Sequence, residues 1–571
     1  MNQFPHLKFA GKIEGLPIYN GGGQNERSKN NRENRQGHAT TLLGSTSQIQ
    51  LDWEDFISKR VKLGLPELDK EVIPVFLQIN PGILTGQFDF LDYGIEIISE
   101  EENGFIIGAS LDNLTTLEEK INGYITSTRS TGKIADLWEI VNGNRDQWRP
   151  EHILSPSLLK DWPNILDDQM YPIEVSIAFD KPLKKEPSAR FKKKLEVYQT
   201  ERERRNDEMM SRQNHFEKFI NVYGTLESSY VEIEDSFACE ILISGKGLKD
   251  LVVNYPYVFE VKERTQLDIV STDFIYNNDS ELEIIGPDQN DPEVAIIDSG
   301  IMEYNRYIRD AIHPQESQNY VLTDNTKADM VPGGHGTKVA GAVLYPNGIS
   351  HLPTPYTLPC RIKNIRVLNS DNELVSLYPP QLMQDVFDNN SDVKIFNLSI
   401  SNFGPELNKH MSPWAAMIDK LIHQEDIIFI LAAGNIHRDT ISNLLLSGLP
   451  YPTYLSEQIS KIADPGQSCF ALTVGSINHH FYEDDNWISL GTDSEISAFS
   501  RTGPGIWNMI KPDVVEYGGG QLVSKDGTYR INENEHTSPE LVRSTLHGGN
   551  AIGRDSIGMQ LLRLATLQPN C

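Results

Sequence analysis

The second half of the chain is marked by strand-sized apolar segments. These segments are 294–297 (VAII), 394–400 (KIFNLSI), 427–433 (IIFILAA) and 470–477 (FALTVGSI). Such runs are typical of strands that are buried on both faces of a sheet. Helical patterns lie between them, so the order predicts a parallel, doubly wound α/β sheet. We assign it to a C-terminal domain at 291–571.

The preceding region has a different pattern, with shorter strands and one amphipathic helix. Strand patterns at 75–79, 95–99 and 104–111 are followed by a stretch at 114–125 in which leucine and isoleucine recur at helical spacing. Residues three and four apart share one face of a helix. The pattern predicts a small α+β module at 71–150, with a helix layer on an antiparallel sheet.

A second α+β module is expected at 151–275. A strand pattern at 173–179 leads into a long charged segment at 188–220, and two strands, a short helix and a last strand follow, up to 263. This order matches the split βαβ, or ferredoxin-like, arrangement. Glutamates interleave with the basic residues of 188–220, which favours a solvated helix face over a binding patch.

The N-terminal residues carry little apolar character. Residues 20–40 are rich in glycine, asparagine and arginine. Such a composition favours a solvated, flexible segment over a docking motif. We therefore expect a flexible N-terminal region at 1–70.

Composition and charge narrow the class of protein. The 571 residues carry a formal charge of −29, which disfavours nucleic acid or an anionic membrane as a general partner. Four cysteines are scattered without CxxC spacing, which suits a reducing compartment and indicates neither a disulfide framework nor a zinc site. The chain offers no run of about eighteen apolar residues and no acidic cluster with calcium-loop spacing. We expect a cytoplasmic protein without metal or cofactor.

Three polar residues stand where catalytic groups gather in such sheets, near the carboxyl ends of strands. Asp298 ends the first apolar strand, His335 lies between glycines before a helical pattern, and Asn435 follows the strand ILAAG. A general base needs a carboxylate on one imidazole nitrogen and a free second nitrogen, which Asp298 and His335 can supply. An amide donor such as Asn435 can stabilise an oxyanion. Each residue alone is also compatible with a turn or cap.

The segment FNLSIS at 396–401 is the candidate for substrate binding. An open strand edge there would bind an extended peptide by adding it to the sheet. Its substrate-binding residues are Asn397, Leu398 and Ser399.

At this point the chain resembles the subtilisin-like serine proteases (subtilases, peptidase family S8). The motifs that carry the resemblance are DSG at 298–300, GHGTKVAG at 334–341, NLS at 397–399, AAGN at 432–435, ALTVGS at 471–476, ISAFSRTGP at 496–504 and KPDVVEYGG at 511–519. The resemblance implies a hydrolase of the intracellular type in which Asp298 orients the imidazole, His335 is the general base and Asn435 helps to bind the oxyanion. In that family an N-terminal α+β module often acts as a folding aid and inhibitor, so the two modules are propeptide-like by analogy.

The nucleophilic serine does not appear where the family pattern places it. In HGGNAIGRDSIGMQ the last three residues, Gly558, Met559 and Gln560, stand where the family pattern has Gly-Thr-Ser. Ser556 is the nearest hydroxyl, but it precedes the glycine. The abrupt change of pattern suggests a C-terminally incomplete domain, through truncation or a shifted reading frame. In subtilisin, loss of the serine lowers turnover by about 10⁶-fold, so the sequence predicts a nearly inert chain.

Three functions compete. The first is a serine endopeptidase that hydrolyses peptide bonds through an acyl-enzyme, present here in an altered form. The second is a non-catalytic subtilase-like protein that binds peptides or a partner. The third places the function in 1–290, as a regulatory or inhibitory module for another protease. An AAA-type ATPase is a further partner that the resemblance suggests.

Overall fold

The computed structural model describes residues 26–69, 72–79, 96–101, 104–109, 111–128, 131–141, 145–179, 183, 186–188, 190, 192–267, 274–276, 282–330, 334–346, 348–374, 377–543 and 551–554. The predictions for Ser556, Gly558, Met559 and Gln560 lie outside these residues.

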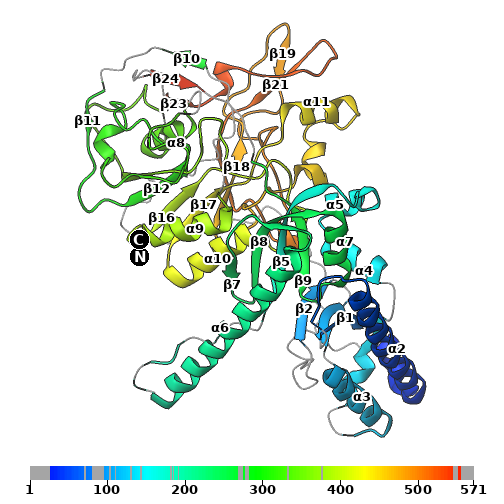
Figure 1. Ribbon diagram of the computed structural model, residues 1–571. Coiled ribbons are helices and arrows are strands. Elements are labelled where there is room, and N and C mark those ends of the chain that lie inside the picture. The colour runs from blue at the N-terminus through cyan, green and yellow to red at the C-terminus, as the bar shows by residue number, and fades with distance from the viewer. Residues whose placement is uncertain are drawn as a thin grey trace, which may run out of the picture.

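The first module is a four-stranded antiparallel sheet with helices packed on it (Figure 1). The strand order is β2-β3-β1-β4. The strands are β1 (Ile73–Ile79), β2 (Glu96–Glu101), β3 (Gly104–Ala109) and β4 (Leu137–Val141). Helix α3 (Leu111–Ile125) covers the sheet and buries the predicted leucine and isoleucine stripe.

The expectation of a flexible N-terminal region is wrong for residues 26–62. They form helices α1 (Glu26–Glu33) and α2 (Arg35–Lys62). Helix α2 lies against α3 and buries apolar side chains that include Leu42 and Trp53. The segment is helical because this packing removes its apolar face from water, although its own composition is a weak helix signal.

The second module repeats the strand order of the first. Its sheet runs β6-β8-β5-β9, with β7 paired to β8. The strands are β5 (Met170–Ala178), β6 (Gly224–Leu226), β7 (Val231–Ile233), β8 (Ser236–Ser244) and β9 (Val258–Glu263). Strand β8 lies between β5 and β6 and is antiparallel to both, which is the predicted split βαβ arrangement.

The helices of the second module include the long charged one. They are α4 (Arg145–Ile153), α5 (Pro156–Asp161), α6 (Lys192–Ile220) and α7 (Gly245–Asn254). Part of α6 projects away from the rest of the molecule in Figure 1. One continuous apolar core joins the two modules, from Ala39 to Val261.

The C-terminal domain is built on a seven-stranded sheet in the order β13-β15-β12-β16-β17-β18-β20, and every pairing in it is parallel. The strands are β12 (Glu293–Asp298), β13 (Gln318–Asn319), β15 (Arg361–Arg366), β16 (Ile395–Leu398), β17 (Ile428–Ala432), β18 (Leu472–Ile477) and β20 (Val514–Tyr517). The prediction of a parallel sheet is confirmed.

Helices cover both faces of this sheet. Helices α9 (Pro379–Asp388) and α10 (Pro413–Glu425) share one apolar core with it. Helix α8 (His335–Leu344) shares a second core on the other face. The remaining elements are α11 (Arg438–Leu446), β10 (Phe274–Tyr276), β11 (Ile284–Ile285), β14 (Tyr356–Thr357), β19 (Trp487–Ser489), β21 (Gln521–Ser524), β22 (Ile531–Glu533), β23 (Glu540–Arg543) and β24 (Ala551–Arg554).

The second module meets the C-terminal domain through apolar and charged contacts. Strand β7 lies against α10, and Val231 joins the core beneath α9 and α10. Beside this contact the ammonium of Lys262 lies 3.2 Å from Glu174, 3.6 Å from Asp464 and 3.9 Å from Glu406. All four charged groups are buried side chains at the boundary of the two units.

Candidate active site

Asp298 ends β12 and is fully buried. Its Oδ1 atom accepts hydrogen bonds from the backbone N–H of Ser299 at 2.7 Å and from the Ser299 hydroxyl at 3.1 Å. These donors hold the carboxylate in one orientation at the carboxyl end of a central strand, as the sequence predicts.

His335 is the first residue of α8, and its imidazole meets Asp298. The Nδ1 atom lies 2.8 Å from Oδ1 and 3.0 Å from Oδ2 of Asp298. Gly334 caps the helix with a φ of 70°, a conformation that favours glycine. A Cβ on Gly336 would lie 2.2 Å from the carbonyl oxygen of Gly300. Glycine at 336 therefore allows the start of the helix to approach the turn after Asp298.

The imidazole of His335 is under opposing electrostatic influences. Burial lowers its pKa, but the charge and the hydrogen bond of Asp298 raise it more, so the pKa of His335 lies above its usual 6.5. The side chain keeps 23% of its surface exposed. Among the described residues, no group hydrogen-bonds to its Nε2 atom. This nitrogen can therefore accept a proton from a group placed next to it.

Asp329 is part of the site and was missed by the sequence analysis. Its buried carboxylate accepts hydrogen bonds from the Ser299 hydroxyl at 3.0 Å and from the N–H and hydroxyl of Thr337 at 3.0 and 2.9 Å. Burial raises the pKa of Asp329 to about 6, despite these donors. The residue links the turn after β12 to the first turn of α8. Its only sequence signal was a position six residues before His335.

Asn435 follows β17, two strands from Asp298 in the same sheet. Neighbouring strands lie about 4.8 Å apart, so the ends of β12 and β17 are separated by roughly 10 Å. The backbone of Asn435 bridges to Ser500. The buried Oδ1 atom of its side chain has no hydrogen-bond partner among the described residues. The amide does not contact Asp298 or His335 within that part of the chain.

The predicted open edge at Asn397 and Leu398 is wrong. Both residues lie in β16, which pairs with β12 on one side and β17 on the other. Both side chains are buried, and the Asn397 amide donates to the Ser399 hydroxyl at 2.9 Å. No backbone edge is left there for a peptide. Ser399, just beyond the strand, remains a prediction.

An exposed edge does exist a few residues later, and the chain itself occupies it. The backbone N–H of Phe403 donates to the carbonyl of Gln266 at 2.7 Å, and Leu267 forms an antiparallel bridge with Asn402. Residues 266–267 follow β9 of the second module. An extended segment from the N-terminal half is thus paired with the loop that follows β16.

The described residues offer neither a metal site nor a membrane-spanning helix. They contain no cluster of three or more His, Cys, Asp or Glu side chains arranged to hold a metal ion. Within the same residues, no helix is long and apolar enough to cross a membrane.

Comparison with known proteins assigns the C-terminal domain. Residues 289–550 match the family described as the Subtilase family. An uncharacterized protein, y4bN, of Sinorhizobium fredii is 32% identical over 112 residues, which make up 19% of this chain and 26% of that protein. The match thus spans about a quarter of the length of this curated relative.

Solved structures of two processing proteases are also similar to the chain. The epidermin leader peptide processing serine protease EpiP of Staphylococcus aureus is 14% identical, with 64% of this chain and 84% of that chain covered and a TM-score of 0.33. The nisin leader peptidase NisP of Lactococcus lactis is 17% identical, with 43% and 73% covered and a TM-score of 0.27.

Proposed function

Residues 289–550 form a domain of the subtilase family, and from this premise we propose that the protein is built to hydrolyse peptide bonds as a serine-type endopeptidase. The observation that carries the proposal is the contact of His335 Nδ1 with both carboxylate oxygens of Asp298, at 2.8 and 3.0 Å. This contact leaves the opposite imidazole nitrogen for proton transfer.

In the proposed reaction Asp298 fixes the tautomer of His335 and stabilises the imidazolium. His335 Nε2 accepts the proton of a serine hydroxyl as its oxygen attacks the peptide carbonyl, and then gives that proton to the leaving amine. The amide N–H of Asn435 donates to the oxyanion of the tetrahedral intermediate. Water hydrolyses the acyl-enzyme by the same path in reverse.

The serine itself is not assigned to any described residue. In the sequence Gly558 is followed by Met559 and Gln560, where the family pattern has Gly-Thr-Ser. Two proposals for this chain follow. Either a nucleophile completes the site in a related form of the chain, or the chain binds peptides without cleaving them.

A fluorophosphonate probe tests the endopeptidase proposal. Sequencing the gene past the codon for Gly558 should reveal a Gly-Thr-Ser helix in one of the reading frames, and a chain that carries it should be labelled at that serine. His335→Ala should abolish the labelling, because the serine loses its base. His351→Ala, a histidine outside the site, is the control. If no frame encodes such a helix and the probe labels nothing, the proposal is wrong for this chain.

Peptide binding without hydrolysis is the second candidate, and a different observation favours it. The pairing of 266–267 with Asn402 and Phe403, through one hydrogen bond and one antiparallel bridge, supports a role of this loop edge in binding an extended segment. We propose that the N-terminal half covers the peptide site in this way, as the family analogy implies for propeptide-like modules. Proline at position 266 would keep the carbonyl that accepts this hydrogen bond. A test of the contact must therefore remove the donor, the N–H of Phe403.

Phe403→Pro removes the donor instead. The variant lacks the N–H that pairs with Gln266, so residues 264–267 should exchange their amide hydrogens faster while α8 remains protected. Unchanged exchange would contradict a covering role.

Finally, we propose a cytoplasmic location, which unpaired Cys239, Cys360 and Cys469 suit. The proposed AAA-type ATPase partner is testable by co-purification from the native host.

A further inference from the structure

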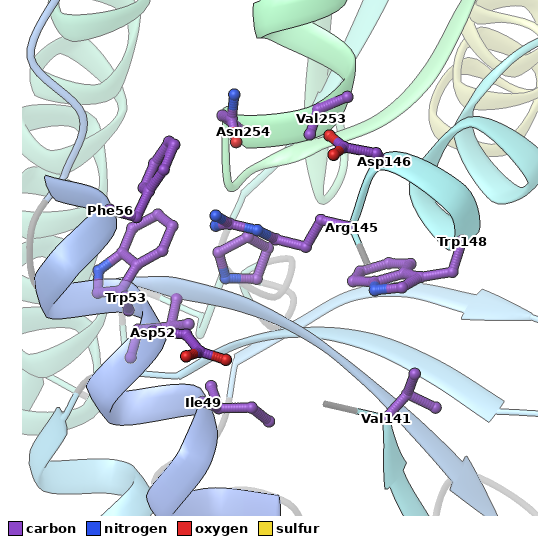
Figure 2. A pocket seen from close by; sticks show the side chains of 12 residues that line it. Ile49, Asp52, Trp53, Phe56, Val141, Arg145, Asp146, Trp148, Val253 and Asn254 are labelled. Atoms are coloured by element: carbon purple, nitrogen blue, oxygen red, sulfur yellow. The ribbon is translucent and has the colours of Figure 1, made fainter. Parts of the chain in front are cut away.

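A pocket in the N-terminal half, far in sequence from Asp298 and His335, has the features of a ligand site (Figure 2). It encloses about 290 Å³ between α2, α4 and α7, above strands β1 and β4. Eight of its twelve lining residues are apolar or aromatic, and the other four are polar or charged. The lining residues are Ile49, Asp52, Trp53, Phe56, Ile73, Pro74, Val141, Arg145, Asp146, Trp148, Val253 and Asn254.

Arg145 brings a buried cation into this pocket, where the charges of Asp146 and Asp52 favour its charged form without forming an ion pair with it. Its guanidinium carbon lies 4.8 Å from the ring centre of Trp53 and 4.4 Å from that of Phe56, and Figure 2 shows the side chain reaching across the pocket toward them. Among the described residues it forms no ion pair, and its buried Nη1 atom has no hydrogen-bond partner. Burial lowers the pKa of Arg145 to about 10, so the group is charged at neutral pH.

Trp148 supplies a second donor without an acceptor. The side chain is 8% exposed, and its indole Nε1–H has no partner within the described part of the chain. Leaving a buried N–H without an acceptor costs about 1–3 kcal/mol. A buried guanidinium nitrogen without an acceptor, as Nη1 of Arg145 is among the described residues, costs more. Both costs fall when an anionic acceptor enters the pocket.

The pocket also limits what that anion can be. Asp52 and Asp146 line the same space, so a dianion such as phosphate is repelled more strongly than a monoanion. The aromatic and aliphatic wall favours an apolar body next to the anionic group. A monocarboxylate on an apolar side chain satisfies both conditions.

We propose that this pocket binds an apolar monocarboxylate, with Arg145 and Trp148 as the donors to its carboxylate. The same chemistry occurs at the C-terminus of a peptide that ends in an apolar residue and in a free organic acid. Such a site on the N-terminal modules lies outside the peptidase chemistry, and its occupancy needs no catalytic serine.

Calorimetric titration of the full chain tests the proposal. The probes are 3-phenylpropionate, its neutral amide, the peptide acetyl-Ala-Phe with a free C-terminus, the same peptide amidated, and inorganic phosphate. The carboxylates should bind at least about tenfold more tightly than the matched amides, because a charge-assisted hydrogen bond to arginine is lost in the amide. Binding of the peptide acid identifies a chain terminus as the ligand. Binding of 3-phenylpropionate alone identifies a small acid.

Variants separate the pocket from the rest of the surface. Arg145→Met should weaken carboxylate binding at least about tenfold and Trp148→Phe by severalfold. Arg35→Met is the matched control, because Arg35 also lies over an aromatic ring, that of Tyr124, outside the pocket. The melting temperature of Arg145→Met should stay equal or rise, since no described ion pair is lost.

Four results would overturn the proposal. The first three are equal affinity for acid and amide, undiminished binding by Arg145→Met, and no carboxylate binding up to about 10 mM. Tighter binding of phosphate than of 3-phenylpropionate would also contradict it. None of these outcomes depends on peptide hydrolysis, so the pocket and the endopeptidase proposal fail separately.

Discussion

Among the charged neighbours of His335, Asp298 has the largest effect on its protonation, and Lys338 and Asp329 have smaller ones. Burial alone favours the neutral imidazole, and the carboxylate of Asp298 reverses this preference, so the pKa of His335 is raised. A group with a raised folded-state pKa stabilises the fold below its unfolded pKa, and this contribution is lost as the pH rises through the folded pKa. The same titration produces the neutral imidazole that the proposed reaction needs.

We predict that Asp298→Asn lowers the pKa of His335 below 6.5. The variant keeps the shape of the side chain but removes its charge, so burial then dominates. Nuclear magnetic resonance of ¹⁵N-histidine-labelled protein measures the titration. Asp310→Asn, at a half-exposed position of the same domain, should leave it unchanged. A His335 pKa that stays above 6.5 in Asp298→Asn would show that another group holds the proton.

Asp329 acts on the site through position rather than through contact with a substrate. Its carboxylate ties Ser299, next to Asp298, to Thr337, two residues after His335. Because burial raises its pKa to about 6, ionisation of Asp329 costs folding free energy as the pH rises from about 4 to about 6.

We predict opposite effects for two substitutions of Asp329. Asp329→Asn keeps an acceptor for Thr337 and removes the ionisation cost, so it should gain up to about 3 kcal/mol relative to the natural chain between pH 4 and pH 7. Asp329→Ala leaves the N–H and hydroxyl of Thr337 without their acceptor, while the Ser299 hydroxyl keeps Asp298, and should lose about 2–5 kcal/mol at every pH. Hydrogen exchange of α8 at several pH values measures both. Identical exchange in the two variants would contradict this account.

Among the elements, α2 owes its stability to what it covers. The helix places Leu42 against the first module and leaves Leu51 facing solvent, 62% exposed. The two leucines share one helix and one residue type, so they form a matched pair. Only one of them removes apolar surface from water on folding.

We predict that Leu42→Ala destabilises α2 and α3 by about 2–5 kcal/mol, whereas Leu51→Ala changes their stability by less than about 0.5 kcal/mol. Hydrogen exchange read peptide by peptide suits a chain of several domains, because a single unfolding free energy is not defined for it. Faster exchange should be confined to the first module. Equal exchange in the two variants would mean that α2 is not anchored by its apolar face.

Burial also explains which strands of the sheet could be predicted from the sequence. The parallel strands with continuous apolar runs were predicted because burial on both faces leaves a local signal. Strand β15 (RIKNIR) was missed, although it lies inside the sheet, because its charged side chains find partners elsewhere. Arg366 is fully buried and pairs with Asp324 through two hydrogen bonds, at 2.5 and 3.0 Å.

The residues of the candidate site also divide into those that a local motif marks and those that only the folded chain brings together. Asp298 and His335 lie in short motifs whose glycines and strand ends are local, so they could be placed from the sequence. Asp329 has its role only because a loop returns to the start of α8, and the occupied edge at 402–403 depends on residues more than 130 positions earlier. A local pattern of apolar and polar residues carries no information on contacts between residues so far apart in the sequence. The open edge assigned to Asn397 and Leu398 failed because strand order decides which edges are free.

At the scale of the whole molecule, a buried ionic cluster joins the N-terminal modules to the peptidase domain. Burial raises the pKa of Glu174 to about 7 and that of Glu406 to about 8, even though both face the ammonium of Lys262. The adjoining His410 lies 3.7 Å from Glu260 and 3.6 Å from Glu101. Other charged groups around the cluster are Asp464, Glu240, Arg264, His152 and Lys409.

The signs of these shifts define a pH window for the interface. Carboxyls with raised pKa values lose stability as they ionise, so Glu174 and Glu406 weaken the contact as the pH rises from about 5 to about 8. The pKa of His410 is raised above its usual 6.5 by its carboxylate neighbours, which outweigh burial, and its contribution is also lost on the alkaline side. The pKa of Glu101 is lowered by its hydrogen bonds to His152 and Ser99 against the effect of burial, so its contribution is lost on the acidic side.

We therefore predict that the N-terminal modules loosen from the C-terminal domain between about pH 5 and pH 8. Hydrogen exchange of β9 and of residues 402–412 should accelerate across this range, while exchange of α9 stays constant. Glu406→Gln should flatten the response because it cannot ionise, and Lys262→Met should shift the response to higher pH because the loss of the ammonium raises the pKa values of Glu174 and Glu406 further. Glu425→Gln, an exposed position of the same domain, is the matched control. An interface whose exchange is equally protected at pH 5 and pH 8 in the natural chain would contradict the prediction, since three buried carboxyl groups around one ammonium cannot all ionise without cost.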